Sequence, residues 1–96
     1  MREIEFSHSY LKDLRLARRR KLPEDELNVV IKKLANDEVL EAKYFDHQLK
    51  GKYAAFRECH IRPDWLLVYR KEDYLKGNRL LKILYLVRTG THSDLF

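Results

Sequence analysis

WLLVYRKEDYLKGNRLLKILYLVR, residues 65–88, is the segment from which the architecture of this chain is predicted. Its two ends, residues 65–70 and 79–88, are rich in aromatic and aliphatic side chains that favour strands. The intervening KEDYLKGN, residues 71–78, carries the aspartate, glycine and asparagine typical of turns. Two strands joined by a short connection predict an antiparallel pair.

The residues before this segment add two more strands. YAAFRECH, residues 53–60, favours a strand, and IRPD, residues 61–64, supplies the turn that leads into residue 65. REIEF, residues 2–6, alternates polar and apolar side chains, as a short strand does. We therefore expect a mostly antiparallel sheet of about four strands.

Two amphipathic helices are predicted between the first strand and the rest of the sheet. Ser7 is placed to cap a helix that reaches about Arg20. Pro23 opens a second helix, whose acidic first turn suits the positive end of the helix dipole, and residues 35–37 (AND) end it. The apolar faces of this helical hairpin need a surface to cover, so the chain is predicted to adopt an α+β fold with the hairpin packed on the sheet.

Size and composition fit a single domain, residues 1–96, with an ordinary core. The chain has 96 residues, of which 45% are hydrophobic, and it contains no internal repeat. No segment approaches the roughly 20 apolar residues of a membrane helix, and no signal-peptide pattern opens the sequence. The single cysteine, Cys59, excludes an internal disulfide and suits a reducing compartment. We therefore expect a cytoplasmic protein without membrane contact.

Positive charge is unevenly distributed along the chain. The formal net charge is +5, and residues 1–21 and 42–96 are basic whereas residues 24–41 are acidic. This division favours a polyanionic partner that meets one face of the molecule, although a solvated basic surface gives the same pattern.

Three of the four histidines lie at the ends of predicted elements, where side chains from different strands can meet. His47 precedes a glycine turn. His60 ends a strand four residues before Asp64, so a short connection is expected to bring these two side chains together. His92 follows Arg88 at the end of the last strand. These positions form a candidate site at one edge of the sheet.

No metal or cofactor site is predicted. Zinc sites prefer closely spaced pairs such as Cys-x₂-Cys or His-x₃-His, and the sequence has no such pair. Cys59 and His60 are neighbours on a predicted strand, so their side chains would point to opposite faces. Cys59 fits a buried structural cysteine better than a nucleophile, and His8 fits a surface position. Gly-rich phosphate loops and nucleophile elbows are absent as well.

The remaining groups suit the cleavage of RNA, which supplies its own nucleophile in the ribose 2′-hydroxyl and needs no metal. Histidine can transfer a proton in either direction near neutral pH, and the candidates are His47, His60 and His92. Arg88 can pair with a phosphate in a bidentate manner, and Phe96 can stack on an unpaired base. Each of these residues also has an ordinary explanation as a surface, turn or core group.

Three motifs occur together in a characteristic order: DHQLKG (46–51), FRECHIRPDWLLVY (56–69) and RTGTHSDLF (88–96). With them the chain resembles, over nearly its whole length, the YafQ-type branch of the RelE/ParE toxin superfamily. The resemblance implies a RelE-like toxin of a bacterial type II toxin–antitoxin system. The activity that it implies is a ribosome-dependent mRNA endoribonuclease that leaves a 2′,3′-cyclic phosphate. It also implies a cognate antitoxin, contact with ribosomal RNA, and binding of operator DNA by the toxin–antitoxin complex through the antitoxin.

The site residues of that family match six positions of this chain, namely His47, His60, Asp64, Arg88, His92 and Phe96. We expect His92, on a flexible terminal segment, to protonate the leaving oxygen. His60, oriented by Asp64, or His47 would accept the 2′-hydroxyl proton, and the acid and base roles can be exchanged. Arg88 would neutralise the phosphate and Phe96 would hold a base.

Two other functions remain open at this point. A ParE-like gyrase inhibitor would share the fold, but that activity does not call for histidines and an acid at these positions. A non-catalytic RNA-binding module would be expected to carry more aromatic residues among its basic ones. The hairpin around residues 71–79 is longer than this branch leads us to expect, and its Lys71, Lys76 and Arg79 either add ribosomal RNA contacts or decorate a loop.

Overall fold

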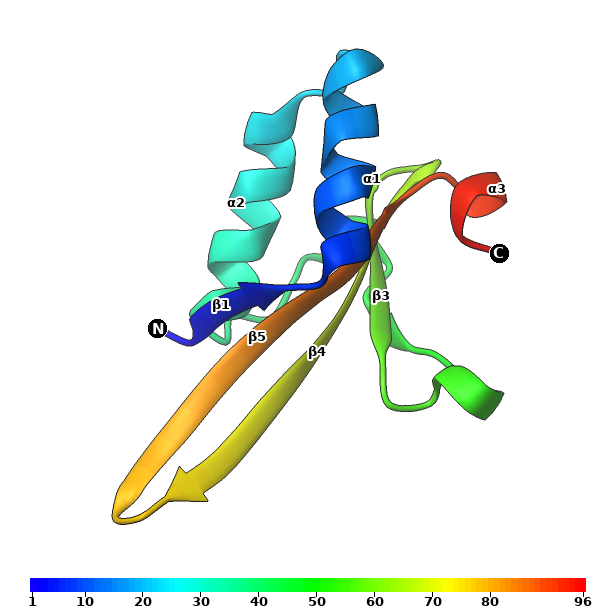
Figure 1. Cartoon of the computed structure of the whole chain (residues 1–96). Helices are drawn as coiled ribbons and strands as arrows, with labels where there is room; N and C mark the ends of the chain where they lie inside the picture. The colour runs from blue at the N-terminus through cyan, green and yellow to red at the C-terminus, as the bar shows by residue number, and fades with distance from the viewer.

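Five strands form one mixed sheet in the order β1-β5-β4-β3-β2, as seen in the computed structural model, which describes residues 1–96 (Figure 1). The elements in chain order are β1 (Glu3–Phe6), α1 (His8–Arg19), α2 (Glu24–Ala35), η1 (Ala42–Tyr44), β2 (His47–Gln48), η2 (Gly51–Tyr53), β3 (Arg57–Arg62), β4 (Trp65–Lys76), β5 (Arg79–Gly90) and α3 (His92–Leu95). The predicted α+β fold, with a helical hairpin on a mostly antiparallel sheet, is confirmed.

The sheet differs from the prediction in its number of strands. The expected four are present, and the fifth is β2, which is only two residues long and pairs with β3 through His47 and Gln48. β1 runs parallel to β5, and all other neighbours are antiparallel. β3 begins at Arg57 instead of residue 53, because Tyr53 ends the short 3₁₀ turn η2 and residues 54–55 form a further turn.

Both predicted helices form between the expected boundaries. Ser7 caps α1, and its hydroxyl accepts a hydrogen bond from the backbone N–H of Tyr10 at 2.9 Å. Pro23, the predicted first residue of α2, is its N-cap, so the helix begins one residue later, at Glu24, with the carboxylates of the first turn. No helix of the structure is long and apolar enough to cross a membrane.

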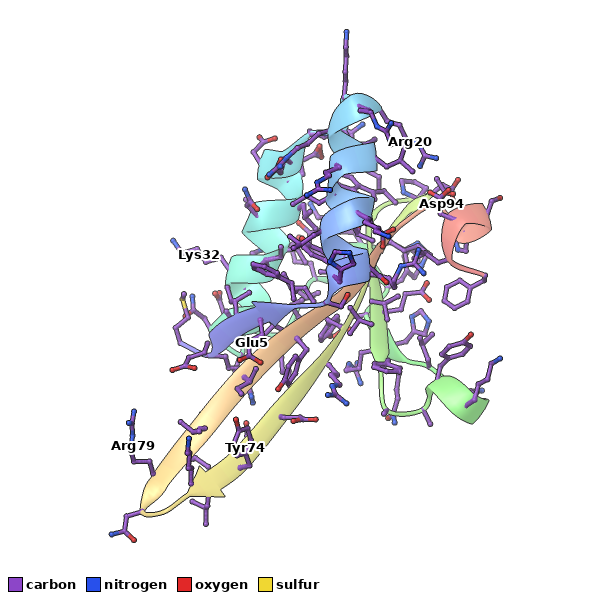
Figure 2. All side chains as sticks on the ribbon, viewed as in Figure 1. Glu5, Arg20, Lys32, Tyr74, Arg79 and Asp94 are labelled. Atoms are coloured by element: carbon purple, nitrogen blue, oxygen red, sulfur yellow. The ribbon has the colours of Figure 1, made fainter.

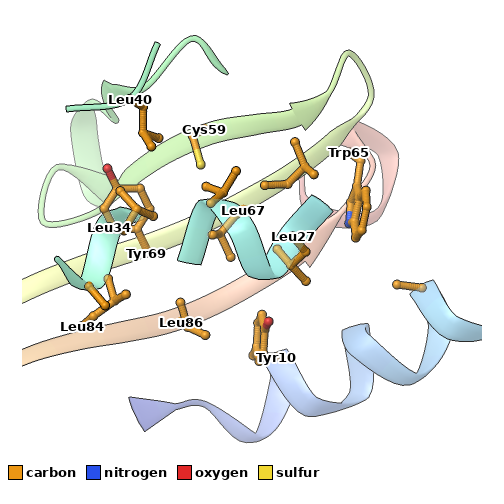
Figure 3. Close-up of a cluster of buried hydrophobic side chains, with 14 residues drawn as sticks. Tyr10, Leu27, Leu34, Leu40, Cys59, Trp65, Leu67, Tyr69, Leu84 and Leu86 are labelled. Carbon is orange, nitrogen blue, oxygen red and sulfur yellow. The ribbon is translucent and has the colours of Figure 1, made fainter. Parts of the chain in front are cut away.

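The core lies between the helical hairpin and one face of the sheet. α1 and α2 lie side by side over this face (Figure 1). Figure 3 shows the buried cluster, in which side chains from both helices meet those from β3, β4 and β5. Its most buried large members are Leu27, Leu34, Leu67, Tyr69 and Leu84.

The hairpin of β4 and β5 is much longer than predicted. Residues 71–76 were expected to belong to the turn, but they are paired strand, and only Gly77 and Asn78 connect the two strands. Gly77 has a φ of 62°, which a two-residue turn commonly requires at this position. β3 pairs with β4 only as far as Tyr69, and β1 starts its pairing with β5 at Ile83. The ribbon beyond these points is two-stranded and projects away from the body of the protein (Figure 1).

Candidate active site

Three imidazoles gather at the β2–β3 side of the sheet. The ring of His60, on β3, lies 6.4 Å from that of His47 on β2 and 5.6 Å from that of His92 in α3, measured between ring centroids. His47 is brought there by the register of β2, in which it pairs with Glu58. The predicted convergence of the three histidines is therefore present in the structure.

Backbone carbonyls fix the tautomers of two of these rings. A carbonyl oxygen can only accept a hydrogen bond, so the ring nitrogen facing it carries the proton. Nδ1–H of His47 donates to the carbonyl of Phe45 at 2.6 Å, and Nδ1–H of His60 donates to the carbonyl of Pro63 at 3.2 Å. In the neutral form of each ring, Nε2 is then left as a proton acceptor.

Asp64 holds His92 and makes no hydrogen bond to His60, which differs from the sequence-based expectation. Its Oδ1 accepts the backbone N–H of His92 at 3.0 Å and the ring Nδ1–H at 2.7 Å. Both bonds lower the pKa of the Asp64 carboxyl, and the bond from the backbone N–H has the larger effect. The carboxylate that faces His60 is Glu58, whose buried Oε1 lies 3.5 Å from Nε2. Glu58 was not identified from the sequence.

The segment that carries His92 is a short capped helix and not the flexible tail that we expected. Thr91 and Asp94 form a capping box at the start of α3. Arg20, at the end of α1, donates two hydrogen bonds to the Asp94 carboxylate, at 2.7 and 3.2 Å, and these two residues face each other in Figure 2. The Arg20 guanidinium holds the pKa of the Asp94 carboxyl well below its usual range. Asp64 and Arg20 thus anchor α3 from two sides.

Arg88 is engaged by an acid that the sequence analysis did not single out. Its Nε donates to Oδ2 of Asp13 at 2.6 Å and its Nη2 to Oδ1 at 3.1 Å, and the N–H of Thr89 also donates to Oδ2. This contact with Asp13 raises the pKa of Arg88. In the sheet register, Arg88 is opposite Val68, which is opposite Glu58. Nη1 makes no contact with Asp13 and remains available to a ligand.

Phe96 lies beside Arg88 and not against the imidazoles. Its ring is 59% exposed and meets the ring of Tyr53 edge-on, with the centroids 6.0 Å apart. Phe96 and Arg88 both line a small cavity of about 120 Å³. The six predicted site residues therefore form two adjoining groups, one of imidazoles with Asp64 and one of Arg88 with Phe96.

Trp65 supports the site from the core. Its side chain is buried, and the indole N–H donates to the Thr89 hydroxyl, which in turn donates to the carbonyl of Leu66 at 2.7 Å. This chain of bonds ties the start of β4 to the end of β5. The interpretation of Trp65 as a core anchor is confirmed.

A trio of possible metal ligands lies within the imidazole group. Glu58, His60 and His92 each offer one ligand atom, and these atoms lie within 4.8 Å of one another. Imidazole nitrogens with a carboxylate oxygen suit Zn²⁺ or Cu²⁺. Spacing rules could not detect this trio, because its members come from β3 and from α3, far apart in the sequence.

Comparison with known proteins places this chain in a family. The family model described as the bacterial toxin of the type II toxin–antitoxin system, YafQ, matches residues 2–96. The mRNA interferase toxin YafQ of Escherichia coli strain K12 is 38% identical over 96 residues, covering 99% of this chain and 96% of that protein.

Solved structures agree with this match. The YafQ chain in a crystal structure of the Escherichia coli DinJ–YafQ toxin–antitoxin complex has a TM-score of 0.81 and 38% identity, covering 99% of this chain and 97% of that one. A copper-bound mutant toxin from Helicobacter pylori has a TM-score of 0.84 and 38% identity, with full coverage of both chains. The chain belongs to the YafQ family of bacterial toxins from type II toxin–antitoxin systems.

Proposed function

We propose that this toxin is an endoribonuclease that cleaves mRNA with the ribose 2′-hydroxyl as nucleophile. The observation that supports this most directly is the cluster of His47, His60 and His92, in which carbonyls fix the tautomers of the first two rings. The cleavage of RNA needs a proton acceptor and a proton donor but no protein nucleophile. Burial raises the pKa of Cys59, the only thiol, which makes it unsuited to that role.

The proposed step moves two protons. Nε2 of neutral His47 takes the proton of the 2′-hydroxyl, and the 2′-oxygen forms a bond to phosphorus as the bond from phosphorus to the 5′-oxygen breaks. Nε2–H of protonated His92 gives its proton to that 5′-oxygen, while Asp64 stabilises the imidazolium through Nδ1. The products are a 2′,3′-cyclic phosphate and a 5′-hydroxyl. His60 lies between the two rings and can replace either partner.

Arg88 and Phe96 bind the substrate in this proposal. Asp13 uses Nε–H and one N–H of Nη2, so the guanidinium meets the phosphate through Nη1 and the second N–H of Nη2, which keeps the expected bidentate pairing. Fixed positive charge stabilises the charge that develops on the phosphorane. The exposed ring of Phe96 stacks on one base of the mRNA.

The setting that we propose is the ribosome, in the cytoplasm. Two cations at the tip of the β4–β5 hairpin, Lys76 and Arg79, are exposed and suited to ribosomal RNA. Lys71 is not suited to bind ribosomal RNA, because its ammonium group pairs with Asp37 at 2.9 Å. Figure 2 shows Arg79 at the far end of the projecting ribbon.

We also propose a cognate antitoxin as the protein partner, as DinJ is for the Escherichia coli YafQ. An acidic or amphipathic segment would complement the basic surface of the toxin. Binding of operator DNA by the complex would then depend on the antitoxin.

The test is the induction of single-residue variants in cells, followed by primer extension on mRNA. His92→Ala and Arg88→Ala should both abolish growth inhibition and new mRNA 5′ ends while the proteins stay folded. His8→Ala is the matched control, because His8 is an exposed imidazole at the start of α1.

Toxicity in a folded His92→Ala variant would contradict the proposed chemistry. DNA damage without loss of mRNA would indicate a gyrase inhibitor instead. Growth inhibition that leaves mRNA uncut and needs none of the histidines would indicate an RNA-binding module.

A further inference from the structure

A wide cleft opens beside the imidazole group. It has a volume of about 860 Å³, within the range of small-molecule sites. His47 and His60 line it, so it is continuous with the proposed catalytic groups. The opposite wall is α2, which contributes Glu26 and Val29. Phe96, the one residue predicted to bind a base, does not line this cleft.

Phe45 is the most unusual residue of the cleft. The residue is 67% exposed, and its ring takes no part in the buried core. Its backbone lies in the left-handed region, with φ 47° and ψ 42°. A bulky residue rarely adopts this conformation, and such strain is concentrated at functional sites. The ring stands edge-on to His60, with the centroids 5.6 Å apart.

The backbone role of Phe45 does not explain its side chain. The carbonyl that orients His47 would be present in any residue at this position. Glycine or asparagine would adopt the left-handed conformation with less strain. What needs explaining is an exposed aromatic ring, held in a strained position next to two imidazoles.

Nucleobases are the ligands that exposed aromatic rings in RNA-binding proteins commonly hold, by stacking. The rim of the cleft is polar: Lys43 lies beside Phe45, and Arg62 pairs with Glu26 at 2.7 Å. Lys43 and the Arg62–Glu26 pair can form hydrogen bonds with the edge of a base. Phe96 lines a separate cavity that shares no residue with this cleft, so the two cavities can each hold one base.

We propose that this cleft holds one of the two nucleobases that flank the scissile phosphate, stacked on Phe45. The inference rests on the proposed ribonuclease function and adds a second base-binding position to it. Phe45 is then a residue that sets base preference at one position next to the cut, while Phe96 contacts the other side.

The experiment maps 5′ ends of mRNA across the transcriptome after induction of the toxin and of three variants. Phe45→Gly removes the ring and suits the left-handed backbone, Phe45→Tyr keeps a stacking ring, and Val39→Ala is the control. Val39 is 96% exposed in the same connection and does not line the cleft. Thermal melting of each purified protein shows that it is folded.

Phe45→Gly should reduce the rate of mRNA cleavage by roughly tenfold, as expected for the loss of one stacking contact. Base preference should relax at one position flanking the cut and stay unchanged at the other. Phe45→Tyr and Val39→Ala should retain the parent rate and pattern. Equal rates and identical base preference in folded Phe45→Gly would overturn this inference alone. The absence of new 5′ ends with the parent toxin would overturn the proposed function as well.

Discussion

Replacing Asp13 with asparagine should damage cleavage more than stability. Asp13 is the acid of α1 that holds Arg88, and it receives three hydrogen bonds, from Nε and Nη2 of Arg88 and from the N–H of Thr89. Asparagine has the same shape and keeps one oxygen as an acceptor, but it loses the charge and offers an N–H where Arg88 needs an acceptor. The guanidinium of Arg88 then loses the contact that fixes its orientation.

The magnitude follows from the burial of the pair. The Asp13 side chain is 13% exposed and that of Arg88 37%, so the contact lies between a surface ion pair and a buried one. A hydrogen bond to a charged group is worth about 1.5–3 kcal/mol when buried, and an exposed ion pair about 0.2–1 kcal/mol. We expect Asp13→Asn to cost about 1 kcal/mol, which lowers the Tm of a domain of this size by about 4–8 °C. Misplacement of a catalytic charge can reduce the cleavage rate by about 100-fold.

The assay combines thermal melting with the rate of mRNA cleavage on programmed ribosomes. The matched control is Glu24→Gln, since Glu24 receives a similar pair of bonds from Arg18, at 2.7 and 3.0 Å, on the solvent-exposed side of the helical hairpin. This control should leave cleavage unchanged. If Asp13→Asn lowers the Tm as expected but cleaves at the parent rate, Asp13 does not orient Arg88 for catalysis. A faster rate would mean that Asp13 competes with the phosphate.

Three further outcomes test other parts of the structure. Gly90→Ala should cost about 1–3 kcal/mol and slow cleavage, because an added Cβ would lie 2.9 Å from Oδ2 of Asp94 and displace α3; melting and cleavage assays check this. Arg2, Lys71 and Lys82 hold the pKa of the Asp37 carboxyl well below its usual range. The resulting stability is fully present above about pH 4 and is lost as the pH falls through the pKa of the folded state, so Asp37→Asn should melt with a weaker dependence on acid pH. Cys59, whose pKa burial raises, should resist thiol reagents at pH 8 until the protein unfolds, and labelling of the native protein would contradict its placement.

The sequence was sufficient for the helices and for most of the sheet. Caps such as Ser7 and the apolar spacing of the helices act over a few residues, so they can be recognised locally. β2 could not be recognised, because a two-residue strand has no periodicity. The polar residues 71–76 resembled a loop because both faces of the projecting hairpin are largely outside the core. Arg2 supports this region by donating to Asp73 and to the carbonyl of Glu72, contacts that span about 70 residues of sequence.

The convergence of the three histidines in the candidate site was predictable, but their hydrogen-bond partners were not. His47, His60 and His92 were identified by residue type and by their positions at element ends. That Asp64 binds His92 depends on where α3 packs, and α3 is placed by Arg20, which is 74 residues from Asp94. The exposed ring of Phe45 beside two imidazoles becomes apparent only when β2 pairs with β3.

The basic character of the chain is a weaker guide to RNA binding than its net charge suggests, because many cations are already paired. On α1 and just beyond it, Arg18 binds Glu24 and Arg20 binds Asp94. Further cations are paired elsewhere: Arg2 with Asp37 and Asp73, Arg57 with Asp46, Arg62 with Glu26, and Arg88 with Asp13. The cations that make no ion pair lie on α1 and just after it, on α2, in the connection from β2 to β3, and at the hairpin tip. They are Lys12, Arg15, Arg19, Lys21, Lys32, Lys50, Lys52, Lys76 and Arg79. Attraction of a polyanion therefore depends on these unpaired cations. Among the paired arginines, Arg20 holds α3 in place through Asp94, and Arg88 is itself held by Asp13.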